Sequence, residues 1–522
     1  MSKTSKYTVE KKAAVKNGVY RMGFAVLSII INSIILVSVV VWLGNSWPAF
    51  HMLLSLFSAS IVLGIYSQHR TSSMKMPWIM LILILPIAGL VFYLMVGLNS
   101  STKKMRKRYE DIDAVLLPLL PENAGIMDEL KNKYPFVGNI AYYLKKHAGY
   151  PVYKNTDIVY YDDAAKGIEA QKEELKKAQH FIFMEYHAIE DAQSWHEIQD
   201  ILEEKVKEGV EVRVFYDDMG SIGFVNTDFV KRLRAKGIRA RVFNPFAPGL
   251  NLFLNNRDHR KITVIDGKVG FTGGYNIANE YFHICEPYGY WKDTGIRFEG
   301  DAVRSLTITF LEMWNAIKGN DIDDISFEKY LVNYDYKSRE NGYVIPYADS
   351  PMDAVQVGED VYMSMAEMAK DYVWYITPYL IITDEMINTL SLAARRGVDV
   401  RIITPGIPDK KIIYSVTRSY YNVLARNGVK IYEYSPGFCH AKMSICDDTA
   451  ATCGTINLDY RSLYHHFENG CLYCGCEAVA KTKADFIKIF EQSQEVTEYY
   501  VSSRGSFLRF GQMILRLFAP LM

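Results

Sequence analysis

One short motif occurs twice in this chain, 181 residues apart, and it constrains the fold more than any other feature. The first copy, HRKITVIDGKVGFTGGYN, begins at His259, and the second, HAKMSICDDTAATCGTIN, begins at His440. Both have the spacing H-x-K, four residues, D, six residues, then G-[GT]-x-N. A single H-x-K triplet recurs by chance, whereas two copies that match at six positions without a gap are a strong signal. The motifs predict a duplicated fold in which each half supplies one part of a shared active site.

The residue types in the motif suit attack on a phosphorus atom. Imidazole, with a reference pKa of about 6.5, can attack or transfer a proton near neutral pH, so His259 and His440 are the candidate nucleophile and leaving-group acid. Side chains two apart on a strand share a face, so each lysine should point into the same cleft as its histidine. The residues expected to bind the non-bridging phosphate oxygens are Lys261, Lys442, Asn276 and Asn457.

The motif aspartates, Asp266 and Asp447, belong to the candidate catalytic set by their place in the pattern. Their neighbours favour a structural role instead. Asp266 and Gly267 lie between two β-rich runs, and Asp447 and Asp448 lie at the matching point of the second half, which is typical of a hairpin turn. We therefore expect both aspartates to brace the hairpin or its neighbours.

A second pair of carboxylates follows the motifs. Asp293, in WKDTGIRFEG, and Glu468, in FENGCLYC, each stand two residues before a glycine and an apolar run. A carboxylate that accepts a hydrogen bond from a histidine Nδ1–H fixes the tautomer, so these two are the candidate His-orienting residues; the alternative is a strand-edge carboxylate bound by backbone amides. His187, His465 and His466 also lie near these strands but lack repeat-matched spacing, and are interpreted as ordinary polar or pocket residues.

The paired H-x-K-x4-D and G-[GST]-x-N segments resemble the phospholipase D superfamily. The apolar N-terminus and the continuation NLDYRS followed by FENG are similar to its bacterial cardiolipin synthase branch. The resemblance covers residues 150–500 and, more loosely, the N-terminus. It implies a pseudo-dimer, a phosphohistidine intermediate with His259 as nucleophile and His440 as acid, and no metal or cofactor. Family members often have serine where this chain has Gly274 and Thr455.

Strand-like and helix-like segments alternate in the same order in both halves. The first half reads HFIFMEYHAI, SWHEIQDILEEKVKEG, VEVRVFYDD, NTDFVKRLRAKG and IRARVFNP, and the second has a matching series from DYVWYITPYL to VKIYEYSP. Strands that alternate with helices of about 10–15 residues favour right-handed βαβ units. We predict an α/β fold: a duplicated phospholipase D-like pseudo-dimer with mixed, largely parallel β-sheets flanked by helices. The repeats are expected at residues 146–325 and 340–500, after a linker at 99–145.

The first 98 residues are expected to be a membrane region. Residues 22–43 and 77–98 each form 22 positions without a charge, close to the roughly 20 residues needed to cross a bilayer. Residues 49–66 could span, or lie as a re-entrant or interfacial helix. Lys and Arg cluster before the first segment and after the third, so both ends belong inside and the number of crossings is even. We predict N-terminal transmembrane helices with two crossings, a multi-pass protein of the cell membrane and a catalytic part that faces the cytoplasm.

Residues 503–520 carry Arg509, Gln512 and Arg516 as a narrow polar stripe on an apolar segment. The pattern predicts an amphipathic C-terminal helix that lies in a membrane interface, with docking on the protein's own core as the alternative.

Charge and cysteine content exclude some classes. Lys plus Arg and Asp plus Glu are both 59, so no nucleic-acid partner is expected. Cys471, Cys474 and Cys476 have no second Cys/His cluster nearby to complete a zinc site, and are expected to be small buried residues.

The preferred hypothesis is a membrane phosphatidyltransferase that makes cardiolipin and glycerol from two phosphatidylglycerol molecules. A phosphodiester is exchanged for a phosphodiester, so a covalent histidine intermediate conserves the bond without ATP. The alternatives are another phospholipase D-type phosphatidyltransferase, a lipid hydrolase, a membrane-tethered nuclease, and a non-catalytic membrane scaffold.

Overall fold

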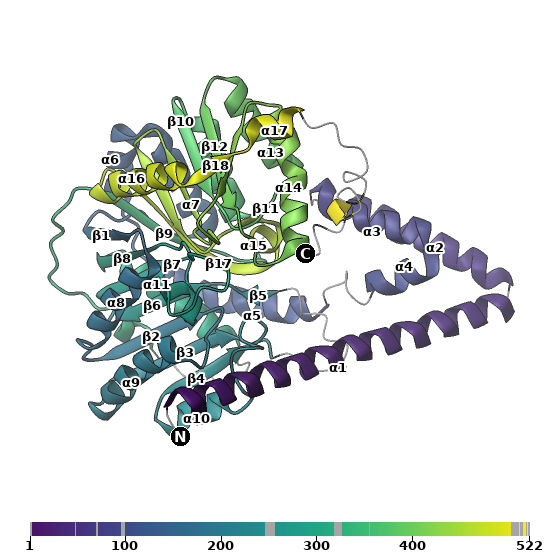
Figure 1. Ribbon diagram of the computed structural model, residues 1–522, viewed down its shortest axis with the longest axis horizontal. Helices are drawn as coiled ribbons and strands as arrows, with labels where there is room; N and C mark the ends of the chain where they lie inside the picture. Colours follow the sequence, from purple (N-terminus) through teal and green to yellow (C-terminus); the bar gives the residue numbers. More distant parts are fainter. Residues whose placement is uncertain are drawn as a thin grey trace.

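The computed structural model describes residues 3–46, 48–68, 71–94, 100–245, 256–317, 326–353 and 355–502, together with 511, 515–517 and 519. Figure 1 shows a body built around two β-sheets, and a long helical arm that projects from it. The arm consists of the N-terminal helices. The body contains both copies of the motif, one in each half.

The first half forms a sheet with the strand order β1-β8-β7-β6-β2-β3-β4. Its predicted alternation of strands and helices is confirmed, and β2, which pairs with β3 on one side and β6 on the other, is buried along its whole length. The strands are β1 (Thr156–Tyr161), β2 (Phe181–Tyr186), β3 (Glu211–Asp217), β4 (Arg239–Phe243), β6 (Lys261–Ile265), β7 (Val269–Gly273) and β8 (Gly295–Gly300). The helices are α8 (Ala164–Leu175), α9 (Gln193–Lys207), α10 (Phe229–Ala235) and α11 (Val303–Ala316).

The second half repeats this plan in the order β18-β13-β12-β10-β14-β15-β17, with β9 paired to β17. Here β10 takes the place of β2, and the motif hairpin is β14 and β15. The strands are β9 (Tyr343–Asp349), β10 (Tyr372–Ile376), β12 (Asp399–Pro405), β13 (Lys430–Tyr434), β14 (Met443–Cys446), β15 (Ala450–Gly454), β17 (His466–Cys474) and β18 (Ser493–Glu495). The helices are α12 (Val357–Met368), α13 (Asp384–Arg395), α14 (Lys411–Ala425), α16 (Glu477–Glu491) and α17 (Thr497–Ser502).

The sheets are mixed, as predicted, but the expectation that they are largely parallel is wrong. Among the described strands of the first sheet, only the β2–β3 and β3–β4 pairings are parallel. The motif hairpin β6–β7 and the strands β8 and β1 beyond it all pair antiparallel. The βαβ rule correctly describes the parallel strands β2, β3 and β4. On the other side of β2, the hairpin β6–β7 pairs antiparallel, and so do β8 and β1, which follow it in the sheet.

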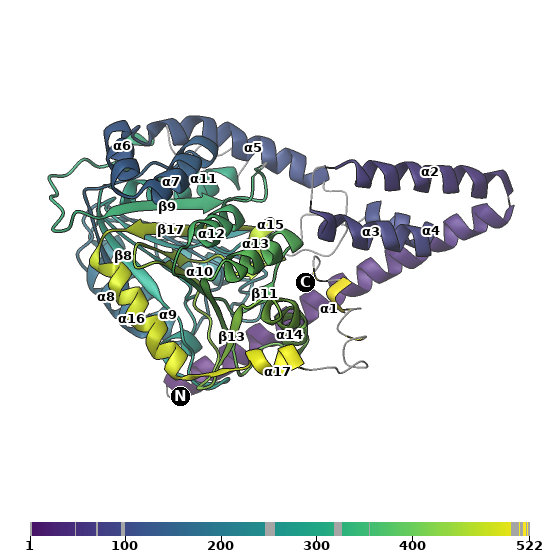
Figure 2. The ribbon, with the colours of Figure 1, turned by 90° about the horizontal axis from the view of Figure 1, so that it is seen from above.

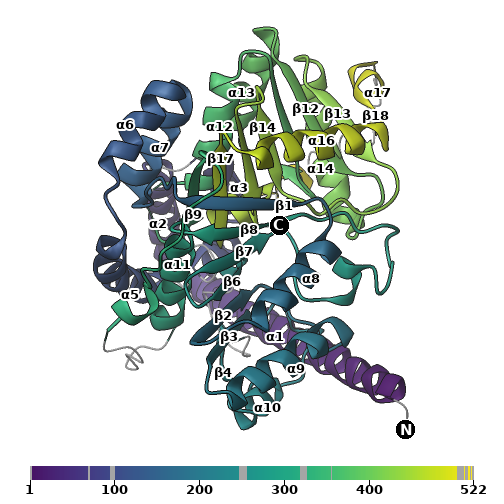
Figure 3. The same cartoon turned by 90° about the vertical axis from the view of Figure 1, so that its left-hand side faces the viewer.

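The two halves are joined by reciprocal backbone contacts at the motif histidines. Strand β5 (Arg257–Asp258) of the first half pairs in parallel with the start of β17, and the amide of His259 donates to the carbonyl of Phe467 at 2.8 Å. In the other direction, the amide of His440 donates to the carbonyl of Lys292 at 2.7 Å. Phe467 and Lys292 directly precede the two candidate orienting carboxylates, and β15 packs against β7 and β8 between the halves. Figure 3 shows the strands β6, β7 and β8 of the first half below the strands β12, β13 and β14 of the second. Each motif histidine is therefore held by the opposite half.

The arm begins as a long helical hairpin. Helix α1 (Lys3–Ser46) runs away from the body and α2 (Pro48–Tyr66) returns beside it, as Figures 1 and 2 both show. Within α1, residues Val15–Val39 form the one helix of the described residues that is long and apolar enough to cross a membrane. The apolar helices Met52–Tyr66 and Ser72–Ile84 are shorter. In the part of the chain that the structure describes, only one of the predicted membrane segments is thus part of a helix long enough and apolar enough to cross a membrane.

The third predicted membrane segment, residues 77–98, is not one continuous helix. Helix α3 (Ser72–Ile84) ends at Leu85, α4 (Pro86–Phe92) begins directly afterwards, and residues 95–98 lie outside the described part. The two helices fold back closely: a Cβ added to Gly89 would lie 2.4 Å from the carbonyl oxygen of Leu81. Pro86 explains the break, because its ring disfavours helical geometry at the preceding residue. The segment is a helix–break–helix.

Residues 99–145, expected to be a linker, instead contain three helices that pack on the body: α5 (Ser100–Leu116), α6 (Ala124–Lys133) and α7 (Pro135–Ala148). Leu116, Leu130 and Leu144 are fully buried in the same core as residues of both halves. The predicted C-terminal helix at 503–520 lies mostly outside the described residues. Of its described residues, Ala519 is buried and the Arg516 guanidinium lies 4.3 Å from the centre of the Tyr420 ring.

Candidate active site

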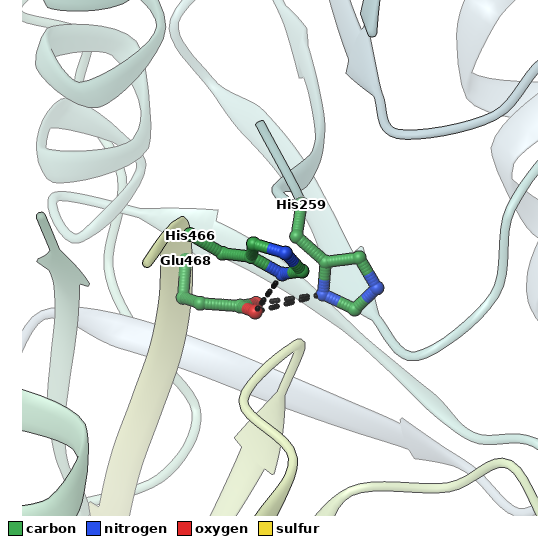
Figure 4. A group of neighbouring side chains, drawn as sticks. All are labelled: His259, His466 and Glu468. Atoms are coloured by element: carbon green, nitrogen blue, oxygen red, sulfur yellow. Dashed lines mark hydrogen bonds and ion pairs between the residues drawn. The ribbon is translucent and has the colours of Figure 1, made fainter. Parts of the chain in front are cut away.

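Each motif histidine pairs with a carboxylate of the opposite half. His259 Nδ1 lies 2.9 Å from a carboxylate oxygen of Glu468, and His440 Nδ1 lies 2.7 Å from Asp293 Oδ2. Figure 4 shows the first pair, with the Glu468 side chain directed at the His259 ring. The reciprocal backbone contacts explain this arrangement. Each motif histidine is hydrogen-bonded through its amide to Phe467 or Lys292, and the next residue in the chain is the carboxylate that contacts the histidine ring. The predicted orienting residues are thus in contact with the histidines, exchanged between the halves.

The geometry leaves Nε2 of each imidazole as the reacting nitrogen. A carboxylate at Nδ1 holds the proton there, so that Nε2 carries the lone pair. Burial lowers the pKa of His259 well below its usual value and that of His440 to about 3. Both imidazoles are therefore neutral at pH 7, the form that a nucleophile needs.

The two lysines lie beside their histidines, as the strand spacing predicted. Lys261 Nζ donates to the backbone carbonyl of His259 at 2.6 Å, and Lys442 Nζ lies 2.7 Å from His440 Nδ1 and 3.0 Å from its Nε2. Burial lowers the pKa of Lys261 to about 7 and that of Lys442 to about 8, and the charge of Lys442 further lowers the pKa of Lys261. Two buried ammonium groups, one of which lowers the pKa of the other, favour the binding of an anionic ligand.

The two carboxylates are supported differently. The Thr455 hydroxyl donates to Glu468, whereas Asp293 Oδ1 accepts from the backbone amide of Thr294 at 2.8 Å. The matching position of the first half is Gly274, where an added Cβ would lie only 2.0 Å from Asp293 Oδ1. In one half-site the Thr455 hydroxyl therefore bonds to the longer Glu468 side chain. In the other, the missing side chain of Gly274 leaves space for the shorter Asp293 side chain.

The predicted phosphate-binding asparagines have other partners. Asn276 donates from Nδ2 to the Tyr281 hydroxyl at 2.8 Å and accepts at Oδ1 from the Ala188 amide at 3.1 Å. Asn457 makes a side-chain hydrogen bond to Asp459, while its Oδ1 has no hydrogen-bond partner among the described residues. Both lie buried near the histidines. As they stand, they brace the loops around the site, and binding a phosphate oxygen would require either amide to leave its partner.

The motif aspartates are not in the reacting group. Asp266 accepts hydrogen bonds from the amides of Gln179, His180 and Phe181, all between 2.8 and 2.9 Å. Asp447 does the same for residues 370–372 before β10, at 2.7 to 2.9 Å. Asp266 lies five residues beyond Lys261, a strand length of roughly 16 Å. Their place in the candidate catalytic set is corrected: they tie the hairpin turn to the start of the neighbouring strand, as the turn pattern favoured.

Two further histidines surround His259, and the sequence analysis interpreted both as ordinary polar or pocket residues. The His187 and His466 rings lie 4.8 and 5.4 Å, centre to centre, from the His259 ring. The signal for His466 was present, since it stands two residues before Glu468 on one strand and so shares its face. Around His440 the surroundings are aromatic instead: Tyr281, Trp291 and Phe438. The two half-sites therefore share a plan but differ in environment.

Two buried His–Lys half-sites that converge from duplicated halves define an enzyme of the phospholipase D class. The family model described as "Cardiolipin synthase, PLD-like domain" matches residues 172–293 and 362–490, and the phospholipase D-nuclease N-terminal model matches residues 53–97. The chain belongs to the cardiolipin synthase family of phospholipase D-like proteins.

Similar proteins cover nearly the whole chain. A cardiolipin synthase of Halalkalibacterium halodurans is 32% identical over 92% of this chain and 95% of its own length. A cardiolipin synthase of Geobacillus kaustophilus is 31% identical over 95% and 99%. Among solved structures, phosphatidylserine synthase of Haemophilus influenzae superposes with a TM-score of 0.55 at 16% identity, over 73% of this chain and 97% of that one. This last likeness shows the fold alone.

Proposed function

We propose that the protein is a membrane phosphatidyltransferase that converts two phosphatidylglycerol molecules into cardiolipin and glycerol through a phosphohistidine on His259. The observation that carries the proposal is the pair of exchanged His–carboxylate contacts, each with a buried lysine beside it. This arrangement offers a nucleophile, an acid and a cationic pocket for one phosphodiester. The family membership supports phosphatidylglycerol as donor and acceptor.

In the first step, His259 Nε2 attacks the phosphorus of one phosphatidylglycerol. The bond from phosphorus to the glycerol headgroup oxygen breaks, and that oxygen takes a proton from His440. Burial lowers the pKa of His440 to about 3, so the protonated imidazole needs the negative charge of the bound phosphodiester beside it and of Asp293 behind it. Lys261 and Lys442 hold the non-bridging oxygens as charge develops on them.

In the second step, a hydroxyl of another phosphatidylglycerol gives its proton to the now neutral His440. Its oxygen attacks the phosphohistidine, the P–N bond breaks, and cardiolipin leaves with His259 restored as neutral imidazole. Asp293 and Glu468 are not consumed in the cycle and act by holding Nδ1–H. One phosphodiester is exchanged for another, so the cycle consumes no external energy source.

The N-terminal arm supports attachment at the cytoplasmic face through more than one crossing. Within α1, Arg21 is paired with Asp218 of the body, and the uncharged residues 22–43 follow this contact. Helix α2 then returns the chain to the same side, which agrees with the positive charge on both flanks of the arm. Two crossings would keep the active site on the side where phosphatidylglycerol headgroups of the inner leaflet are presented.

The test is a product assay with purified full-length protein in mixed micelles. Phosphatidylglycerol should give equimolar cardiolipin and glycerol, whereas phosphatidylcholine without an acceptor and DNA should give no product. Release of phosphatidic acid as the main product would replace the transferase with a hydrolase, and cleavage of DNA would replace it with a nuclease.

A further inference from the structure

His466 is buried beside the proposed nucleophile without a hydrogen-bonding role. Its side chain is 9% exposed, and neither ring nitrogen makes a hydrogen bond within the described part of the chain. Its Nδ1 lies 3.5 Å from a carboxylate oxygen of Glu468, the same group that contacts His259. A buried imidazole with two unused nitrogens costs free energy, and neither proposed chemical step uses it.

The three side chains have the composition and spacing of a transition-metal site. Each of His259, His466 and Glu468 offers one ligand atom, and these atoms all lie within 4.8 Å of one another. Ligands bound to zinc at about 2.0–2.1 Å in a tetrahedron are about 3.3 Å apart. The His259–Glu468 and His466–Glu468 separations, 2.9 and 3.5 Å, bracket that value.

The second half has no equivalent group. The residue two positions before Asp293 is Trp291, whose indole ring lies 5.6 Å from the His440 ring and carries no ligand for a metal ion. Among the residues that the structure describes, this is the one such cluster, and it is formed where His259 of the first half meets β17 of the second.

We propose that His259, His466 and Glu468 bind a zinc ion, and that zinc holds the enzyme in an inactive form. A metal on His259 Nδ1 needs the lone pair of that nitrogen, so the remaining imidazole proton moves to Nε2. Nε2 then has no lone pair with which to attack phosphorus. The metal also takes the carboxylate that otherwise orients the ring. Zinc is thus an inhibitor that excludes the reactive tautomer.

The experiment uses full-length protein in detergent with the exposed Cys285 replaced by serine, so that a surface thiol does not bind the metal. Zinc binding is measured by equilibrium dialysis and by the rise in melting temperature, and cardiolipin formation is measured at the same zinc concentrations. We expect one zinc per chain, a higher melting temperature, and inhibition that EDTA reverses. The binding measurements do not depend on the proposed reaction, so their outcome is separate from that of the proposed function.

Two variants isolate the site. His466→Gln should keep its zinc-free rate within twofold, because His466 takes part in neither step, while the zinc concentration for half-inhibition rises at least about tenfold. His466→Phe should behave in the same way and guards against a folding defect of either variant. The matched control is His283→Gln, which removes an imidazole bonded to Asp163 outside the cluster and should stay as zinc-sensitive as the wild type. Unchanged zinc binding in both His466 variants, or activation by zinc, would overturn the proposal.

Discussion

Gly274→Ala should cripple the enzyme by displacing Asp293. An added Cβ would lie 2.0 Å from Asp293 Oδ1, and contacts of this type do not occur below 3.0 Å, so the oxygen must move by about 1 Å. The Asp293 side chain is fully buried and held at both oxygens, by the Thr294 amide and by His440 Nδ1 at 2.7 Å. The shift would lengthen the contact to His440 beyond hydrogen-bonding range. Loss of a hydrogen bond to a charged group costs about 1.5–3 kcal/mol, which corresponds to about a 10- to 150-fold lower rate.

The assay is the initial rate of cardiolipin formation at saturating phosphatidylglycerol, with the melting temperature measured in parallel. Thr455→Ala is the matched control, because it removes a side chain at the equivalent position and creates no clash. It loses the hydrogen bonds of the hydroxyl to Glu468 and to the Asn469 backbone but displaces neither carboxylate, so it should slow the enzyme less than Gly274→Ala does. If Gly274→Ala keeps more than half of the wild-type rate, the tight fit around Asp293 does not control catalysis and the orienting role of this carboxylate is refuted.

The remaining predictions concern the reacting groups. His259→Ala and His440→Ala should each lower cardiolipin formation by more than about tenfold. His440→Asn should accumulate an acid-labile phosphoryl adduct on His259. If peptide mapping of the wild-type enzyme instead finds the adduct on His440, the roles of the two histidines are exchanged. Because burial lowers the pKa of Lys261 to about 7 and that of Lys442 to about 8, their cationic forms are lost as pH rises, so kcat/KM should fall from pH 7 to 9; a profile that rises over this range contradicts the cationic phosphate pocket. Activity should survive excess EDTA, since lysines supply the charge, and loss restored only by Mg²⁺ or Zn²⁺ would disprove a metal-free reaction.

The sequence predicted the duplication, the order of strands and helices, and the two His–Lys pairs, because these depend on local periodicity and on matched spacing. It could not tell which histidine meets which carboxylate. His259 lies 209 residues from Glu468, and their contact depends on how two halves pack, which no spacing within one half encodes. The direction of most strand pairings was predicted wrongly for a related reason. The βαβ pattern is visible in the local sequence, whereas the pairing of the β6–β7 hairpin with β2 depends on tertiary packing.

Other misses had visible causes. Pro86 stands inside the third apolar segment, and its effect on the preceding residue would have divided residues 77–98 into two helices. The helices at 99–145 were overlooked because their charged residues suggested a solvated linker, although the buried side of α7 follows a helical period at Val137, Ile140, Ala141 and Leu144. Cys471 and Cys474 are buried as expected, and Cys476 is partly exposed.

The exchanged contacts also determine when the protein becomes reactive during its synthesis. Helix α1 precedes the body in the chain, so the proposed membrane segment is made while most of the body is still missing. A partly synthesised chain that ends before Glu468 already contains His259 but lacks the carboxylate proposed to orient it. In the other pair the order is reversed, since Asp293 is synthesised before His440. Pairing therefore requires synthesis to reach residue 440 for His440 and residue 468 for His259. Because each proposed His–carboxylate dyad is divided between the two halves, a partly synthesised chain lacks a complete proposed active site and should not react with lipid.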